Sequence, residues 1–188
     1  MVEPGLHIPR KQAGYIRKEA SEITKIPART IQYYTDRGFV TPDVAAPTGR
    51  GTTRRYCRKN LVELSFIKEL SAHGYTLEKV EIIMRVVRRS LDKYWNKSND
   101  MPWETDLLLI LLRPGTKHIE VELCREEEMD LPLLIRQSSF SVLRLQGVIL
   151  RVLKVAIGSS KYEAWLELQG STKYTGYSEE EVARILDE

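Results

Sequence analysis

The sequence has few of the features that mark secreted, membrane-spanning or metal-binding proteins. Its 188 residues include only two cysteines, Cys57 and Cys124, which are widely separated. They predict no disulfide framework and favour the reducing cytoplasm. The longest uninterrupted apolar run, Leu107–Leu112, has six residues, far fewer than a membrane-spanning helix needs. Residues 1–14 contain no apolar core, so we expect a flexible N-terminal arm and no secretory signal.

Residue patterns typical of catalysis are also missing. The three histidines, His7, His73 and His118, are isolated from one another. There is no nucleophile motif, no glycine-rich phosphate loop and no recognisable pair of catalytic carboxylates. The acidic run Glu126–Asp130 is compatible with a metal cluster, but neighbouring carboxylates in a loop are usually solvated. We therefore expect no enzymatic activity, no cofactor and no metal site.

What the sequence does contain is a strong division of charge. Up to Asn99 there are 19 Lys and Arg against 10 Asp and Glu, whereas the remainder has 10 against 16. The length is enough for one large domain or two small ones, each with its own core. A basic first half favours a polyanionic partner such as nucleic acid, although a merely solvated basic face is the alternative.

Two short helical patterns lie close together in the basic half. Tyr15–Ile23 carries apolar residues at helical spacing, and Ala28–Asp36 follows after a turn of a few residues that ends at Pro27. The second helix would present Arg29 and Gln32 on one side. Such a pair is the pattern of a helix-turn-helix, but spacing alone leaves a plain helical hairpin equally open.

The next segments predict a wing and two further helices. Asp43–Thr53 is rich in turn-forming residues and leads into basic residues, as a projecting hairpin would. Arg58–His73 is an amphipathic helix whose first turn holds Arg58 and Lys59, where the helix dipole favours acids. Either a bound phosphate or solvation would compensate these two charges.

A helix starting after Thr76 carries a heptad pattern. The apolar positions follow one another at spacings of four, three, four and three residues: Val80, Met84, Val87, Leu91 and Tyr94. We call these five residues the seam. The seam spans only about two heptads, so it could pair with a second copy of the chain or be buried against its own chain.

Taken together, five sequence blocks resemble the MerR family of bacterial transcription regulators and the related excisionase-type winged helix-turn-helix domains. The resemblance spans about Tyr15–Met84. The blocks are Glu19–Ile23, then Arg29–Tyr34 with Arg37–Val40 and Pro42, then Gly51–Tyr56, Leu64–Lys68 and Gly74–Glu78.

The resemblance implies that the helix Ala28–Asp36 enters the DNA major groove while the wing follows the backbone. Arg29 and Gln32 would contact base edges. One of the two tyrosines in this helix would reach a phosphate and the other would pack inward. The candidate phosphate contacts are Lys18, Tyr33, Tyr34, Arg54, Arg55, Arg58 and Lys59.

Several residues depart from the family pattern. Lys25 stands where the turn usually has glycine, Gln32 replaces a common arginine, and Cys57 stands where a serine normally caps the third helix. The family's long dimerisation helix would have to fit into residues 85–98, which is short for that role. Dimerisation is therefore expected to depend on the seam or on the second half.

The second half predicts a small α+β domain over residues 103–188, after a polar break at Asn96–Pro102. Thr105–Arg113 and Lys117–Cys124 read as a β-hairpin. The further expectations are a third strand at Leu131–Ile135, a helix over Ser138–Ile157 or two strands broken at Gln146–Gly147, a strand at Tyr162–Gln169 and a last helix from Ser178. This half could hold an effector pocket, or serve dimerisation or protein docking.

The sequence therefore predicts an α+β protein in four parts. These are the arm 1–14, a winged helix-turn-helix at 15–84, a connector or dimerisation helix at 85–98, and the domain 103–188. We expect a homodimeric transcription regulator in the bacterial cytoplasm, associated with the nucleoid, that distorts an inverted-repeat promoter site. Its partners would be double-stranded DNA, a second copy and RNA polymerase, with an effector left open. The alternatives are an architectural or excisionase-like DNA-binding protein and a winged module that binds protein.

Overall fold

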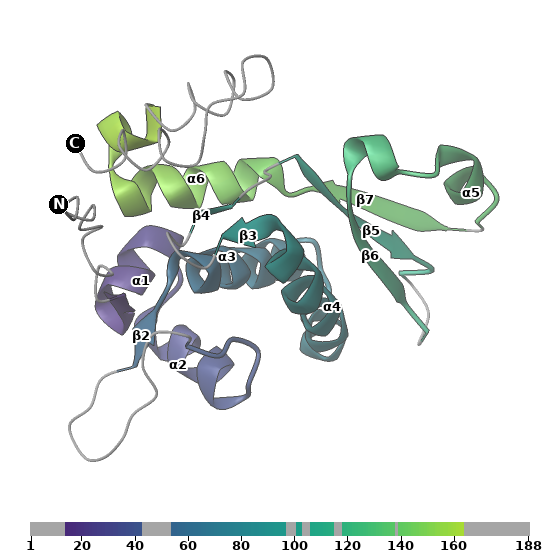
Figure 1. Cartoon of the computed structure of the whole chain (residues 1–188). Helices are drawn as coiled ribbons and strands as arrows, with labels where there is room; N and C mark the ends of the chain where they lie inside the picture. Colours follow the sequence, from purple (N-terminus) through teal and green to yellow (C-terminus); the bar gives the residue numbers. More distant parts are fainter. Residues whose placement is uncertain are drawn as a thin grey trace, which may run out of the picture.

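The computed structural model describes residues 14–42, 54–96, 101–102, 106–114, 118–137 and 139–163. It combines helices with small antiparallel sheets, which confirms the predicted α+β class (Figure 1). The N-terminal arm, the loop Asp43–Thr53 and the helix expected from Ser178 lie outside the described residues. Within the described part, no helix is both long and apolar enough to cross a membrane.

The N-terminal part is a helix-turn-helix supported by two longer helices. It comprises β1 (Tyr15–Ile16), α1 (Arg17–Thr24), α2 (Ala28–Asp36), β2 (Arg55–Tyr56), α3 (Arg58–Ala72) and α4 (Leu77–Leu91). Strand β1 pairs antiparallel with β2, with Tyr15 opposite Tyr56. The α2 helix is too short to be stable alone, so its burial on α1 and the chain around it must hold it. Ile31 at its centre is fully buried.

The turn between α1 and α2 is made by a lysine in the left-handed conformation. Lys25 has a φ of 57° and a ψ of 33°, the region that glycine adopts without steric cost. The Ser21 hydroxyl donates to the carbonyl of Ile26 at 2.6 Å and helps to close the turn. The sequence pattern therefore identified a real backbone requirement, which this protein meets with a strained residue.

Replacing Lys25 with glycine is expected to stabilise the protein. The steric penalty of about 1–2 kcal/mol would disappear, while the flexibility of glycine in the unfolded chain would return about half of it. The free energy of unfolding should rise by about 0.5–1 kcal/mol in urea titrations. Glu22→Gly, at an exposed position inside α1, is the control and should lower it by about 1 kcal/mol. A Lys25→Gly protein less stable than wild type would contradict this account.

The C-terminal part is built around a three-stranded antiparallel sheet with the order β6–β5–β7. After α4 come η1 (Asp92–Tyr94), β3 (Trp95–Asn96), β4 (Met101–Pro102), β5 (Leu107–Leu112), β6 (Glu120–Arg125), η2 (Glu126–Glu128), α5 (Leu131–Ile135), β7 (Phe140–Arg144) and α6 (Gln146–Ile157). The predicted hairpin is confirmed as β5 and β6. Residues 159–163 are helical, so the strand expected from Tyr162 is wrong at its first two residues.

The third strand is not where the sequence predicted it. Leu131–Ile135 forms the short helix α5, because Asp130 accepts a hydrogen bond from the backbone of Leu133 at 2.9 Å and caps its start. The third strand is instead Phe140–Arg144, the first part of the segment expected to be helical. Of the two alternatives for that segment, the strand is right up to Arg144 and the helix is right from Gln146.

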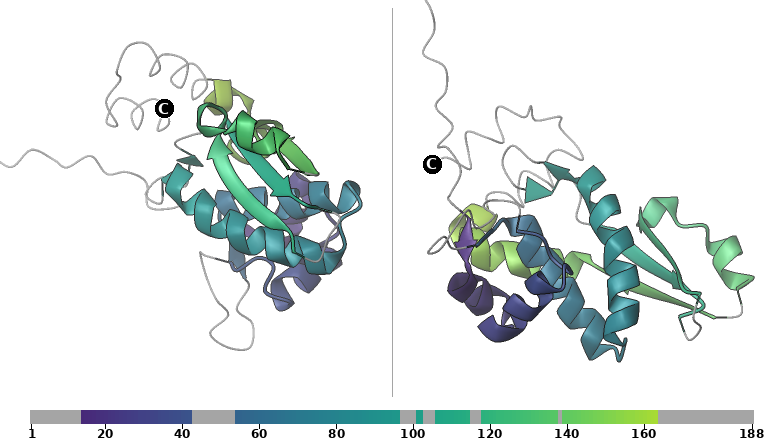
Figure 2. Two further views of the ribbon diagram at one scale, coloured as in Figure 1. Left: turned by 90° about the vertical axis from the view of Figure 1, so that its right-hand side faces the viewer. Right: turned by 90° about the horizontal axis from the view of Figure 1, so that it is seen from below.

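The two halves share one hydrophobic core. Helix α6 packs on α3 and α1, and α4 packs against β6. Figure 2 shows α4 standing between the N-terminal helices and the sheet. Polar contacts also join the halves: the Tyr15 hydroxyl donates to the carbonyl of Ala156 at 2.8 Å, and Arg151 pairs with Glu69 at 2.5 Å. A second, smaller cluster fills the outer face of the sheet around Leu108 and Leu134.

The seam is buried against the protein's own chain. Val80, Met84, Val87 and Leu91 are at most 1% exposed and belong to the shared core. Tyr94 is half-buried, and its hydroxyl donates to Glu128 at 3.4 Å. Of the two alternatives that the heptad pattern left open, the structure shows burial against the protein's own chain. A dimer interface at these residues stays a prediction, and their low exposure does not support it.

Candidate DNA-binding surface

Helix α2 separates its side chains into an outer polar face and an inner apolar face. Arg29, Gln32 and Tyr33 are exposed on the outer side. Tyr34 is buried and packs edge-on against Phe39, with ring centroids 5.8 Å apart. Tyr33 is thus the outward tyrosine and Tyr34 the one that packs inward, and a phosphate contact of either stays a prediction.

Arg17 adds a group to this face that the sequence analysis did not single out. It is the first residue of α1, and its guanidinium donates to the Gln32 side-chain oxygen at 2.5 Å. The Gln32 oxygen is therefore already engaged, and its amide nitrogen is the group left to donate to a base. Fifteen residues separate the two in the chain, so no helical spacing rule could have joined them.

Two further cations flank the outer face of α2. The Arg37 guanidinium lies 5.6 Å from the centroid of the Tyr33 ring, a cation–π arrangement. Arg54, at the start of the wing's return strand, pairs with Asp36 at the end of α2 at 2.5 Å. This exposed ion pair places the predicted wing arginine beside the recognition helix. The other wing arginine, Arg55, donates to the carbonyl of Gly14 at 3.1 Å and is half-buried.

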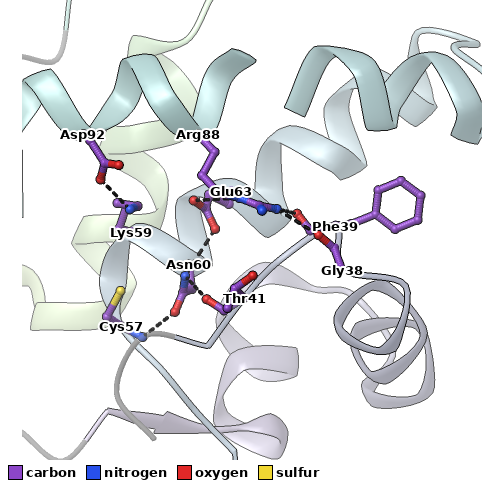
Figure 3. A network of polar contacts seen from close by, with 9 residues as sticks. All are labelled: Gly38, Phe39, Thr41, Cys57, Lys59, Asn60, Glu63, Arg88 and Asp92. Atoms are coloured by element: carbon purple, nitrogen blue, oxygen red, sulfur yellow. Dashed lines mark hydrogen bonds and ion pairs between the residues drawn. The ribbon is translucent and has the colours of Figure 1, made fainter. Parts of the chain in front are cut away.

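A buried polar network holds the chain that leaves α2 (Figure 3). Asn60 donates to the carbonyl of Thr41 at 3.0 Å and to the Glu63 carboxylate at 3.2 Å. Arg88 reaches across from α4, donating to the carbonyls of Gly38, at 3.1 Å, and Phe39. Its Nε lies 3.8 Å from Oε1 of Glu63, whose side chain is 1% exposed. The network fixes the exit of the recognition helix to both α3 and α4.

The two cations in the first turn of α3 do not behave alike. The Lys59 ammonium pairs with Asp92 at 2.7 Å, and its side chain is only 12% exposed. A protein carboxylate thus occupies the place that the sequence analysis gave to a DNA phosphate, and Lys59 is not carried into the functional proposal. Arg58 is half-buried, Lys18 is exposed on α1, and their phosphate contacts stay predictions.

Two arginines pair with the three glutamates of the acidic run after β6. Arg125 pairs with Glu128 at 2.7 Å and with Glu127 at 2.9 Å, and Arg144 pairs with Glu126 at 2.7 Å. The hydrogen bonds from Arg125 hold the pKa of Glu128 below its usual range. Among the described residues, no three His, Cys, Asp or Glu side chains are grouped so that they could hold a metal ion.

Removing Arg88 is expected to destabilise the protein strongly. Arg88→Ala would remove the guanidinium that lies 3.8 Å from the buried Glu63 carboxylate, together with its hydrogen bonds to the carbonyls of Gly38 and Phe39, which costs about 3 kcal/mol of unfolding free energy. Glu63→Gln in the same background should recover part of that loss, because a neutral amide costs less to bury. The neighbouring exposed Arg89→Ala is the control and should change stability by less than about 0.5 kcal/mol in the same denaturant titrations. Equal effects of the Arg88 and Arg89 variants would refute the role given to the network.

Comparison with known proteins identifies the N-terminal half. The profile of the MerR helix-turn-helix family of regulatory proteins matches residues 15–86. Uncharacterised HTH-type transcriptional regulators of Mycobacterium bovis and of two Mycobacterium tuberculosis strains are each 27% identical over 92 residues. These alignments cover 47% of this chain and only 41% of each relative. The family match agrees with the exposed side chains of α2 and the arginine beside them. Residues 15–86 form a helix-turn-helix domain of the MerR family.

Proposed function

We propose that this protein is a transcription regulator that binds double-stranded DNA through α2 and the adjoining wing. The observation that carries the proposal is the exposed set Arg29, Gln32 and Tyr33 on one face of α2, with Arg54 held at its end. By analogy with the MerR family, it acts as a homodimer on an inverted repeat. It distorts the DNA there and repositions the promoter for RNA polymerase.

The side chains of this surface suit two different tasks. Arg29 and Gln32 are long enough to hydrogen-bond base edges in the major groove. We expect Arg54 and Arg37, beside this face, to contact the phosphate backbone, which positions the protein without reading sequence. The Arg54–Asp36 pair is exposed on both sides, so exchanging the carboxylate for a DNA phosphate would cost little.

Selection from a random pool of DNA duplexes at physiological salt tests the proposal directly. Recovery of an inverted repeat would support a dimeric regulator. Recovery of tandem or unrelated sequences would favour an architectural or excisionase-like protein instead. Failure to enrich any sequence would contradict specific DNA reading and leave the protein-binding role.

Arg29 and Arg54 are expected to fail in different ways. Arg29→Ala should lose roughly 1–3 kcal/mol of discrimination at one base pair, because a base contact is removed. Arg54→Ala should weaken binding to all sequences alike and reduce the slope of log affinity against log salt by about one. Fluorescence anisotropy with the selected site and single-base variants gives both quantities. A uniform loss in both variants would show that Arg29 does not read a base.

Arg17 is expected to set what Gln32 reads. A glutamine recognises adenine by donating and accepting at once, and Arg17 occupies its acceptor oxygen. Arg17→Ala should therefore raise the preference for adenine at the base pair that Gln32 faces, as measured by repeating the selection. The adjacent exposed residue supplies the control, Lys18→Ala, which should leave base preference unchanged. An Arg17 variant with the wild-type preference would exclude this role.

The architectural alternative has one observation in its favour. Helix α4 ends at Leu91 and the chain turns through η1 into β3, so the described residues contain no long helix after α4 of the kind with which MerR regulators dimerise. A dimer formed by the described part of the chain would therefore use a surface other than such a helix.

A further inference from the structure

Exposed apolar side chains are concentrated on one part of the C-terminal sheet. Five of the nine large hydrophobic residues that are exposed in the described part fall within Leu131–Val142. They are Leu131, Leu133 and Ile135 on α5, and Phe140 and Val142 on β7. Both elements share the outer face of the sheet, because Leu134 of α5 packs on Ile110, and Val142 lies opposite Ile110 in the ladder. Exposed apolar side chains gathered on neighbouring elements in this way indicate an interaction surface.

The two edges of the sheet differ sharply. On the outer face, β6 carries the exposed acids Glu120 and Glu122, and charged side chains protect a sheet edge from pairing. On the same face, β7 carries Phe140 and Val142, which are 41% and 39% exposed, and Arg144. No described strand pairs with the far side of β7. One edge is thus protected by charge and the other is apolar.

Backbone hydrogen bonds show which groups β7 directs away from β5. Arg113 N–H donates to the carbonyl of Ser139 at 2.9 Å, and Leu145 N–H donates to the carbonyl of Leu107 at 2.8 Å. Because bonding direction alternates along an antiparallel ladder, Ser141 and Leu143 also bond toward β5. The N–H and C=O groups of Phe140, Val142 and Arg144 therefore point to the open edge.

We propose that this open edge of β7 is a self-association surface, on which β7 of a second copy adds antiparallel about a two-fold axis at Val142. This register uses the outward backbone groups of all three residues on both strands. It places Arg144 opposite the partner's Phe140 and keeps the two arginines apart, while Arg144 retains its ion pair with Glu126. A register centred on Arg144 would set like charges opposite each other.

The space beside β7 suits a second strand. A groove of about 340 Å³ lies there, walled by the α3 residues Phe66 and Leu70 and the α6 residue Val148. The same register sets Leu143 of one copy opposite the small Ser141 of the other, on the side of the sheet that faces this groove. The backbone groups of the second β7 strand therefore match those of the first, and Leu143 of each copy lies beside the small Ser141 of the other.

The test begins with sedimentation velocity of the full chain over a range of concentrations. Wild type should be a dimer. Val142→Pro removes an N–H that points to the open edge and leaves the β5 ladder intact, so it should be a folded monomer. Val142→Thr keeps that N–H and should remain dimeric. A wild-type protein that stays monomeric throughout overturns the inference.

A charge variant keeps the test decisive if the proline variant fails to fold. Val142→Lys sets two ammonium groups opposite each other and should also give a monomer. Ile82→Lys, at a residue of similar exposure on α4, is the matched control and should stay dimeric. A dimer that survives Val142→Lys moves the interface elsewhere and overturns the inference.

Disulfide formation tests the register. Only Val142 faces its own copy, at a spacing that a disulfide can bridge, so Val142→Cys should give a covalent dimer on oxidation. Phe140→Cys faces Arg144 and should not. Equal cross-linking of both variants, or of wild type, refutes this register.

The consequence for DNA rests on the proposed function. Val142→Lys should bind a single half-site like wild type and lose about 100-fold in affinity for the inverted repeat. If wild type dimerises but binds no DNA, the proposed function fails and the self-association surface stands. If wild type binds the repeat and Val142→Lys binds it equally well, the surface fails and DNA reading stands.

Discussion

The buried contact between Glu63 and Arg88 is the interaction on which the DNA-binding half depends. A carboxylate that is 1% exposed carries a large desolvation cost, which the hydrogen bond from Asn60 and the guanidinium of Arg88, 3.8 Å away, help to offset. Arg88 supplies the cation and also binds the carbonyls just after α2. Because α2 is a short helix, its orientation depends both on the burial of Ile31 and Tyr34 and on this anchor at its exit.

The same anchor explains how α4 is used in this protein. A heptad pattern describes one apolar face on a helix, but it says nothing of what covers that face. Here the sheet and α3 of the same chain cover that face. Near the C-terminal end of the helix, Arg88 reaches the exit of α2. The helix that might have paired with another copy serves as the internal support of the fold.

Local patterns in the sequence predicted what local forces decide. The two helices of the helix-turn-helix and the β5–β6 hairpin follow from turn residues and periodicity within a few positions. The special backbone position at Lys25 was indicated by the resemblance to the MerR family, in which a glycine usually stands there. The strand predicted at Leu131–Ile135 was wrong, because the capping hydrogen bond from Asp130 favoured a helix over the strand that the apolar composition suggested. The sequence left helix and strand open for Phe140–Arg144. Pairing with β5 decides for the strand, and this long-range contact overrides helical periodicity.

The candidate site shows the same division. Exposure of Arg29 and Gln32 could be predicted from helical geometry, whereas the choice between Tyr33 and Tyr34 needed the position of Phe39. The partners of Arg17, Lys59 and Arg88 lie 15 to 50 residues away in the chain. Such pairs depend on how whole elements pack. The sequence therefore suggested a phosphate as the partner of Lys59, whereas in the fold Lys59 pairs with Asp92.

The packing of α6 against α3 and α1 has a mechanical consequence. Helix α6 continues directly from β7 and reaches the first strand of the DNA-binding domain, where Ala156 accepts the Tyr15 hydrogen bond. The path from the sheet edge to α2 therefore runs through the packed helices α6 and α1. Two copies joined along that edge would hold their α2 helices at a fixed distance. DNA whose half-sites are spaced differently would then have to twist to bind both helices.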